Sequence, residues 1–253
     1  EFSKAENDND KNFIQKYLTL TKCDLFFADK AIMIEGPTER ILMPEFIKKL
    51  NSANLSSQFI STVEIGGAYA HHFYKFLDFL ELKTLIITDL DSTKPEPTDK
   101  GIKFIACPVS DGKKSSNTGI IKWFSCKDDN GKDKENVDLT EICSKKLRDK
   151  IQGTRRIAYQ NDEDSKDCCG RSFEDAFIIA NPALFGIKET RGKDLETKAF
   201  EEAKKYISKK TDFAIKYAYE ESNWKIPLYI KEGLIWLSEN ESNKVLSSDV
   251  IKL

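Results

Sequence analysis

The sequence has few of the residues on which several common classes of protein depend. Histidine occurs only at His71 and His72, and none of the six cysteines forms a CxxC pair followed by a second such pair. The usual zinc modules are therefore excluded. A chain of 253 residues needs no disulfide bonds to fold, so we interpret the cysteines as free thiols in a reducing cytoplasm. No apolar run approaches the roughly 20 residues that cross a bilayer.

Neither sign of charge is in large excess. Lys and Arg number 40, Asp and Glu number 42, and the formal net charge is −2, which argues against a uniformly basic nucleic-acid binder. Residues 1–12 are acidic and polar rather than basic and then apolar, so we predict no signal peptide. The chain begins with Glu1 rather than Met, and we expect it to be a piece of a longer protein. No GxxxxGK[ST] motif is present, so we predict that the chain alone neither binds nor hydrolyses ATP.

Short apolar runs alternate with amphipathic segments along most of the sequence. The predicted strands are residues 31–34, 59–65, 85–87, 102–106 and 156–159. The predicted helices are residues 38–50, 69–80, 119–125, 172–180, 195–209, 212–221 and 228–238. Such an alternation implies right-handed crossovers between parallel strands. We therefore predict an α/β fold with a Rossmann-like, mostly parallel sheet flanked by helices, and an additional helical region at the C-terminal end.

The same pattern divides the chain into three parts. Residues 1–24 are predicted to be a helical lead-in or linker. Residues 25–190 form the predicted catalytic core, within which the charged segment 127–138 is expected to be a loop. Residues 191–253 form a helical region that packs on the core.

Acidic residues stand at the ends of two predicted strands. Glu35 closes the first strand and Glu39 follows at the start of the next helix, while Asp89 and Asp91 close the third strand. Residues two apart in a strand point to the same side, so we expect these two aspartates to converge. The carboxyl ends of parallel strands meet at one edge of the sheet. Carboxylates gathered there repel one another unless cations lie between them, which predicts a site for Mg²⁺ or Mn²⁺.

Taken separately, each acidic motif has a simpler explanation. A glutamate after a strand is more often a helix-start residue that the helix dipole favours, and an isolated DxD is more often a surface or capping feature. The prediction of a metal site therefore depends on the two motifs occurring together, in this order, on one βα scaffold.

The motifs IEG at 34–36 and DLD at 89–91, joined by a βαβ unit, resemble the Toprim domain. Longer strings are similar to the OLD (overcoming lysogenisation defect) nucleases of the class encoded beside a helicase-like partner, which the Gabija antiphage nuclease also resembles. The strings are AIMIEGPTERILMP at 31–44, GGAYAH at 66–71, LIITDLDS at 85–92, SNT at 116–118 and GRSFEDAF at 170–177. The resemblance runs from about residue 25 to residue 237.

The resemblance implies a DNA endonuclease or nickase that uses two metal ions, Mg²⁺ or Mn²⁺. Glu35, Asp89 and Lys210 match its catalytic positions, with Asp89 or Asp91 shared between the ions and Lys210 offsetting charge on the phosphate. The implied metal ligands are Glu35, Glu39, Asp89, Asp91, Ser172 and Glu174. For the full-length protein, the resemblance also implies an N-terminal ATPase region, which alone would bind ATP, a homo-oligomer, a helicase-like partner and a role in phage defence.

Several alternatives stay open at this stage. Ser172 could cap the helix that follows it instead of binding metal, Asp175 could take the place of Glu174, and Lys209 stands next to Lys210. The two histidines lie in an amphipathic segment, and we assign them no catalytic role. The alternative function is a non-catalytic Toprim module for nucleic-acid binding or assembly in a recombination or repair protein.

Overall fold

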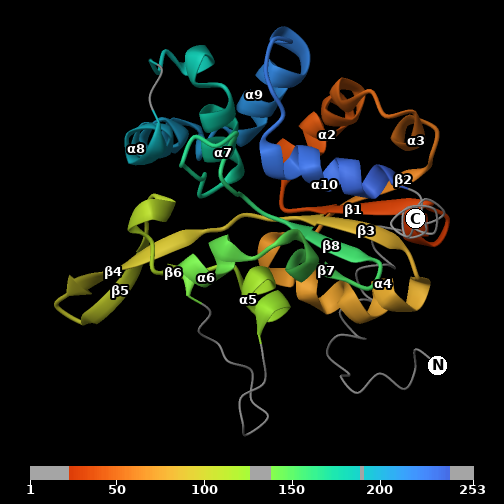
Figure 1. The fold of residues 1–253 in the computed structure, drawn as a ribbon, viewed down its shortest axis with the longest axis horizontal. Coiled ribbons are helices and arrows are strands. Elements are labelled where there is room, and N and C mark those ends of the chain that lie inside the picture. The colour runs from red at the N-terminus through yellow and green to blue at the C-terminus, as the bar shows by residue number, and fades with distance from the viewer. Residues whose placement is uncertain (1–22, 126–137, 189–190, 240–253) are drawn as a thin grey trace, which may run out of the picture.

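A five-stranded sheet forms the centre of the computed structural model, which describes residues 23–125, 138–188 and 191–239 (Figure 1). The strand order is β2-β1-β3-β8-β7. Four strands run parallel, and β7 pairs antiparallel at one edge. They are β1 (Lys30–Ile34), β2 (Ile60–Glu64), β3 (Lys83–Ile87), β7 (Ile151–Gln152) and β8 (Arg155–Ala158). The predicted α/β class with a mostly parallel sheet is confirmed.

Strand β1 shows why its sequence is a continuous apolar run. All five of its residues are buried. Ile32 and Ile34 belong to the hydrophobic core on one face of the sheet, whereas Ala31 and Met33 belong to the core on the other face. Because successive side chains of a strand point to opposite faces, a strand covered on both sides is apolar at nearly every position. In β1 the one exception is its first residue, Lys30.

Helices cover both faces of this sheet (Figure 1). The first face packs against α2 (Pro37–Leu50), α9 (Lys210–Ile215) and α10 (Leu228–Ser238). The second packs against α4 (Tyr74–Leu80), α5 (Thr118–Phe124) and α6 (Leu139–Ser144). Helix α7 (Phe173–Ala180) contributes both to the first core and to a smaller cluster with α8 (Gly192–Ala203). The C-terminal helices thus complete the same core that the parallel strands begin.

Short helical segments connect these elements. The predicted helix over residues 69–80 begins as a 3-10 segment, η3 (Gly67–Phe73), and continues as α4. The other short segments are η2 (Cys23–Phe26), α3 (Ala53–Ser56), η4 (Val109–Asp111), η5 (Leu147–Lys150), η6 (Pro182–Phe185), η7 (Lys204–Tyr206) and the π-helical η8 (Lys216–Glu220).

The prediction that residues 102–106 form a strand of the parallel sheet is wrong. β5 (Gly101–Ala106) pairs antiparallel with β4 (Ser92–Thr98), and β6 (Lys114–Ser115) completes a separate three-stranded sheet. Ile102 is 73% exposed, because β5 lies in a hairpin that extends away from the body of the fold (Figure 1). β4 is not among the predicted strands, and it contains Pro95 and Pro97. Beyond Thr93 it pairs on one side only, where proline is tolerated.

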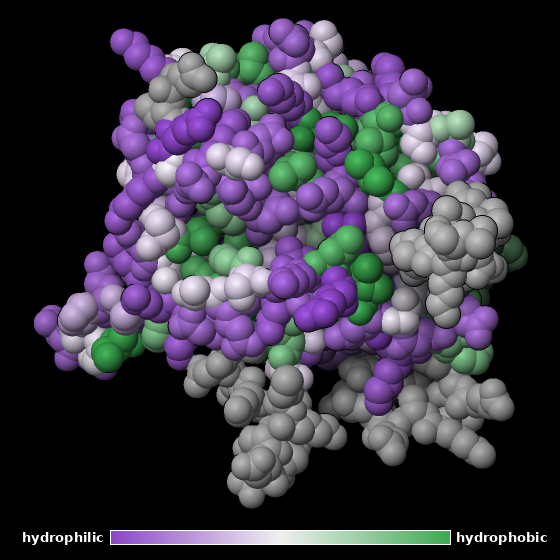
Figure 2. Space-filling model, in the orientation of Figure 1, coloured by the Kyte–Doolittle hydropathy of each residue, from purple (hydrophilic) through white to green (hydrophobic). Residues whose placement is uncertain are grey.

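The hairpin of β4 and β5 extends away from the body of the fold (Figure 1). On the face drawn in Figure 2, hydrophilic residues predominate and hydrophobic residues gather in small groups. Ile102 and Phe104 of the hairpin are both exposed. Scattered exposed apolar residues of this kind are normal for a protein surface.

Some predictions fall on residues outside the described part of the chain. These are almost all of the loop at 127–138, most of the lead-in at 1–24, and the last residues of the C-terminal region. Within the described residues, Cys107, Cys143, Cys168 and Cys169 are free thiols, as predicted. None of the helices in this part is long and apolar enough to cross a membrane.

Candidate functional site

A cleft of about 290 Å³ opens beside the carboxyl ends of β1 and β3. Six of the seven predicted site residues line it: Glu35, Asp89, Asp91, Ser172, Glu174 and Lys210. The seventh, Glu39, is buried in the first turn of α2, where the charges of Glu174 and Glu35 act on it. The structure therefore brings together residues that lie up to 175 positions apart in the sequence, between Glu35 and Lys210.

Glu35 follows β1 directly and joins it to the end of β3. Its Oε1 accepts hydrogen bonds from the Thr88 hydroxyl, from the Asp89 backbone N–H at 2.8 Å and from Asn117 Nδ2 at 2.9 Å. Burial raises the pKa of the Glu35 carboxyl, and these hydrogen bonds offset the effect only in part. The carboxylate is thus held firmly in place although its charge is costly there.

Glu39 is an acidic residue in a nearly dry environment. Its exposed fraction is 4%. Burial, followed by the negative charges of Glu174 and Glu35, raises the pKa of Glu39 to about 8, although Lys210 acts in the opposite direction. A helix N-terminus favours an anion, but this does not compensate for lost hydration and two acidic neighbours. The geometry favours a further cation near this carboxylate.

Asp89 is almost completely buried at the cleft. Its exposed fraction is 6%, and its Oδ1 accepts a hydrogen bond from Gln160 Nε2 at 2.6 Å. Burial raises the pKa of Asp89 well above its usual range, and the charges of Glu35 and Glu39 raise it further. Like charges in a low dielectric cannot all remain ionised without a counter-ion.

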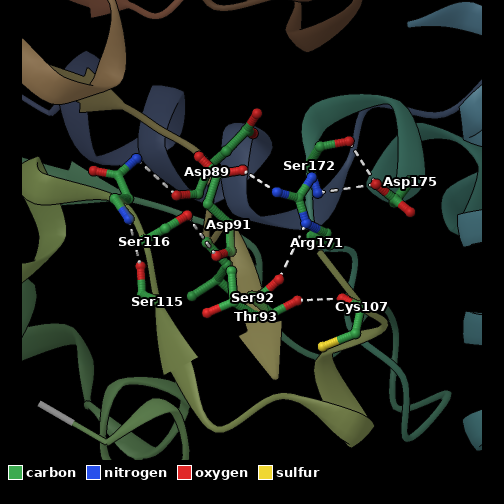
Figure 3. A network of polar contacts seen from close by, with 12 residues as sticks. Asp89, Asp91, Ser92, Thr93, Cys107, Ser115, Ser116, Arg171, Ser172 and Asp175 are labelled. Atoms are coloured by element: carbon green, nitrogen blue, oxygen red, sulfur yellow. Dashed lines mark hydrogen bonds and ion pairs between the residues drawn. The ribbon is translucent and has the colours of Figure 1, made fainter. Parts of the chain in front are cut away.

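Asp91 reaches the cleft by a route that strand periodicity did not predict. β3 ends at Ile87, so the rule that residues two apart share a face does not apply to Asp89 and Asp91. Instead the backbone of Asp91 is left-handed, with φ 48°, a conformation that aspartate tolerates better than most residues. Arg171 Nη2 lies 2.7 Å from Asp91 Oδ1 (Figure 3). Burial raises the pKa of Asp91, and the Arg171 charge lowers it.

The N-terminus of α7 separates the roles of two adjacent acidic residues. Asp175 Oδ2 accepts hydrogen bonds from the Ser172 backbone N–H at 3.0 Å and from Ser172 Oγ at 2.5 Å (Figure 3), so it forms part of a capping box. Burial raises the pKa of Asp175 to about 6. Glu174 points toward Lys210 instead, with 3.3 Å between Oε1 and Nζ. Ser172 Oγ also lies 3.2 Å from Glu174 Oε2, so capping does not remove the hydroxyl from the cleft.

Lys210, the first residue of α9, supplies a positive charge at the cleft. Burial lowers the pKa of Lys210, but the charges of Glu174, Asp89 and Glu39 outweigh this effect, so the pKa is raised. Its side chain is 45% exposed, which leaves the ammonium group accessible to a ligand. Lys209 precedes the helix as its cap residue and does not line the cleft.

Four residues that hold the site together were not predicted from the sequence: Thr88, Asn117, Gln160 and Arg171. Thr88, Asn117 and Arg171 lie within the strings that resemble the OLD nucleases. Their place in these strings could have indicated that they belong to the site. Gln160 has no comparable signal, because only the fold of β8 places it beside Asp89.

The donor set fits a hard divalent cation. The candidate ligands offer carboxylate and hydroxyl oxygens only, which is what Mg²⁺ and Mn²⁺ prefer. As the side chains stand, no three His, Cys, Asp or Glu residues in the described part of the chain form a closed ligand group. Burial is the main cause that raises the pKa values of Glu35, Glu39, Asp89 and Asp91, and neighbouring carboxylates add to it, so Arg171 and Lys210 do not fully compensate the charged forms.

Gly170 controls how closely the segment before α7 approaches that helix. A Cβ at this position would lie 2.5 Å from the Ala176 backbone N and 2.8 Å from its Cα. We expect Gly170→Ala to lower the free energy of unfolding by about 1–3 kcal/mol, because overpacking forces the backbone to shift. The shift would also displace Arg171 and Ser172.

Urea unfolding checks this prediction, with Gly36→Ala as the control. At Gly36 a Cβ would make only an ordinary contact, 3.8 Å from Glu39 Oε2, so we expect the smaller loss. Equal stability of Gly170→Ala and the parent would contradict the tight packing.

Comparisons with known proteins show what this chain is similar to. Residues 26–91, which include Glu35, Glu39, Asp89 and Asp91, match the family model described as Overcoming lysogenization defect protein-like, TOPRIM domain. Endonuclease GajA of Bacillus cereus (strain HuB5-5) is 28% identical over 256 residues, which cover 92% of this chain and 35% of that protein. Endonuclease GajA of Bacillus cereus (strain VD045) is 30% identical over 90 residues, which cover 35% of this chain and 15% of that protein. The chain therefore spans about a third, or less, of the length of these relatives.

Proposed function

Because the chain contains an OLD-like Toprim domain, we propose that it is a divalent-metal-dependent DNA endonuclease or nickase, the nuclease part of a longer OLD-family protein. Two similar proteins bear the name endonuclease. The observation that carries the proposal is the cleft in which carboxyl groups from the ends of β1 and β3 and from α7 meet Lys210.

The proposed ions are two Mg²⁺ or Mn²⁺. The residues that would hold them are Glu35, Glu39, Asp89, Asp91, Ser172 and Glu174. When bound, such ions lower the pKa of water and stabilise negative charge on a phosphodiester. A phosphodiester is itself an anion, so it could not approach this acidic cleft without them.

Two positively charged side chains of the cleft, Lys210 and Arg171, have roles in the proposed mechanism. Lys210 is exposed enough to contact a phosphate oxygen and close enough to Glu174 to be oriented by it. Its charge would stabilise the additional negative charge that develops on the phosphate during cleavage. Arg171 also lines the cleft and forms an ion pair with Asp91. Glu35 and Asp89, which accept hydrogen bonds from Asn117 and Gln160, would set the position of the reacting centre.

A plasmid assay on the chain as it stands tests this function. Supercoiled plasmid incubated with Mg²⁺ or Mn²⁺ should become nicked or linear, and EDTA should prevent it. Calorimetry should show that the chain binds Mn²⁺. A chain that neither cuts nor binds the ion would instead be a non-catalytic Toprim module.

Lys210→Ala tests whether Lys210, rather than the adjacent Lys209, is the lysine that acts at the site. We expect a decrease in kcat of about 100-fold, the typical effect of removing one group that stabilises transition-state charge. Mn²⁺ affinity should change little, because an ammonium group is not a metal ligand. The matched control is Lys209→Ala, which should cut plasmid at nearly the parent rate. A larger loss for Lys209→Ala than for Lys210→Ala would reverse the assignment.

The wider biological setting belongs to the same proposal and follows from the OLD-like relationship. We place the protein in the cytoplasm, in phage defence, with a helicase-like partner. We also place ATP binding and homo-oligomer formation in the full-length protein. Addition of ATP to this chain should therefore leave its cutting rate unchanged.

A further inference from the structure

Two buried side-chain amides, Asn117 and Gln160, each hold one of the central carboxylates. Their exposed fractions are 4% and 1%. Asn117 Nδ2 donates to Glu35 Oε1 at 2.9 Å, and Gln160 Nε2 donates to Asp89 Oδ1 at 2.6 Å. Asn117 comes from the start of α5 and Gln160 from the segment after β8. Two separate parts of the fold thus supply the same kind of contact.

Backbone N–H groups fix the orientation of both amides. Asn117 Oδ1 caps α5 by accepting from the Ile120 N–H at 3.1 Å, and Gln160 Oε1 accepts from the Leu90 N–H at 2.7 Å. Only the oxygen of an amide can accept from an N–H group. The NH₂ group of each amide must therefore face the carboxylate, and a flipped amide would lose both contacts.

These contacts occupy only one oxygen of each carboxylate. Glu35 Oε1 accepts from the Thr88 hydroxyl, the Asp89 N–H and Asn117. A carboxylate oxygen has about two lone-pair sites, so this oxygen is fully occupied. Asp89 Oδ1 accepts from Gln160. Within the described residues, no hydrogen-bond donor is assigned to Glu35 Oε2 or Asp89 Oδ2.

We propose that Asn117 and Gln160 are positioning residues that turn Glu35 Oε2 and Asp89 Oδ2 toward the cation, so that each carboxylate binds it through that oxygen. This inference rests on the proposed function, because it presupposes that the cleft binds metal. Partners that orient metal ligands in this way affect affinity although they do not touch the ion. Their loss typically weakens metal binding by about 10- to 100-fold.

Exchange of each amide for the corresponding acid tests the inference. Asn117→Asp and Gln160→Glu keep the oxygen that accepts the backbone N–H and replace the NH₂ group that faces the carboxylate. The Asn117 NH₂ group also lies 2.7 Å from Thr88 Oγ1 and 2.9 Å from the Asp89 carbonyl oxygen, and that of Gln160 lies 3.3 Å from the Tyr229 hydroxyl. The matched control is Asn181→Asp. Asn181 is also buried and accepts from a backbone N–H, that of Lys225 at 2.6 Å, but it donates only to backbone carbonyls.

The measurements are Mn²⁺ affinity, the electron paramagnetic resonance spectrum of bound Mn²⁺, and the unfolding temperature in EDTA. We expect about 10- to 100-fold weaker Mn²⁺ binding and an altered spectrum for both site variants, and parent values for Asn181→Asp. A crystal of the parent with Mn²⁺ should show the ions against Glu35 Oε2 and Asp89 Oδ2. This last test does not depend on the folding of any variant.

Two results would overturn the inference alone: unchanged Mn²⁺ affinity in folded Asn117→Asp and Gln160→Glu, or an ion bound to Glu35 Oε1. A parent chain that binds no Mn²⁺ would overturn the proposed function as well. The affinity of the parent therefore distinguishes the two failures.

Discussion

Asp89→Asn is expected to lose more than about 100-fold in plasmid cutting and in Mn²⁺ affinity. Loss of a residue that only orients a ligand costs about 10- to 100-fold, and Asp89 is itself a proposed ligand at the centre of the cluster. The exchange keeps the size of the side chain and an oxygen that can accept from Gln160. What it removes is the negative charge that a divalent cation needs.

The same variant should be at least as stable as the parent in EDTA. Burial and the charges of Glu35 and Glu39 raise the pKa of Asp89 well above its usual range, so the metal-free fold already favours an uncharged group there. The control is Asp99→Asn, in the exposed turn between β4 and β5, which should match the parent in all three measurements. If Asp89→Asn cut plasmid at the parent rate, the nuclease site would have to lie elsewhere in the protein.

Mn²⁺ binding is expected to strengthen steeply with pH and to level off above about pH 8. In the metal-free protein the pKa of Glu39 is raised to about 8, first by burial and then by Glu174 and Glu35. A ligand carboxylate must lose its proton before it binds a cation. Below the pKa of the ligand, the association constant falls about tenfold for each pH unit by which the pH is lowered, because the cation must displace a proton. Between about pH 6 and pH 8, Glu39 alone should therefore change the affinity by about 50-fold, because about half of its carboxyl groups are ionised at a pH equal to the pKa.

Stability without metal should follow the opposite course. The pKa of Glu39 is about 8 in the folded chain and has a reference value of 4.5, so between these values the folded state binds more protons than the unfolded state. The free energy of unfolding in EDTA must then fall as pH rises through this window. Saturating Mn²⁺ should reverse the fall, because the bound ion stabilises the ionised carboxylates.

Calorimetry in buffers of different ionisation enthalpy measures the protons released on Mn²⁺ binding, and thermal unfolding in EDTA measures the stability. Glu39→Gln should flatten both pH dependences. An affinity that stays constant between about pH 6 and pH 8 would show that Glu39 is not a ligand.

The sequence by itself determined the class of the fold and the main acidic residues of the cleft. A strand covered on both faces is mostly apolar, so β1 and β3 stood out by their apolar runs. β8 was less marked, because it begins with the buried Arg155 and Arg156. The carboxyl ends of parallel strands share one edge, so Glu35 and Asp89 could be expected to meet. The proposal that these residues bind metal goes beyond both observations.

Only the tertiary structure decided which neighbours act on those residues. β5 contains as many apolar residues as a core strand. It nevertheless lies in an exposed hairpin, because it pairs with β4. Asp91 reaches the cleft through a left-handed turn rather than a strand. Gln160 and Arg171 face Asp89 and Asp91 across more than 70 positions of sequence. Strand and helix periodicity describe neighbours along the chain, whereas hydrogen bonds and charges act between atoms that only the packed fold brings together.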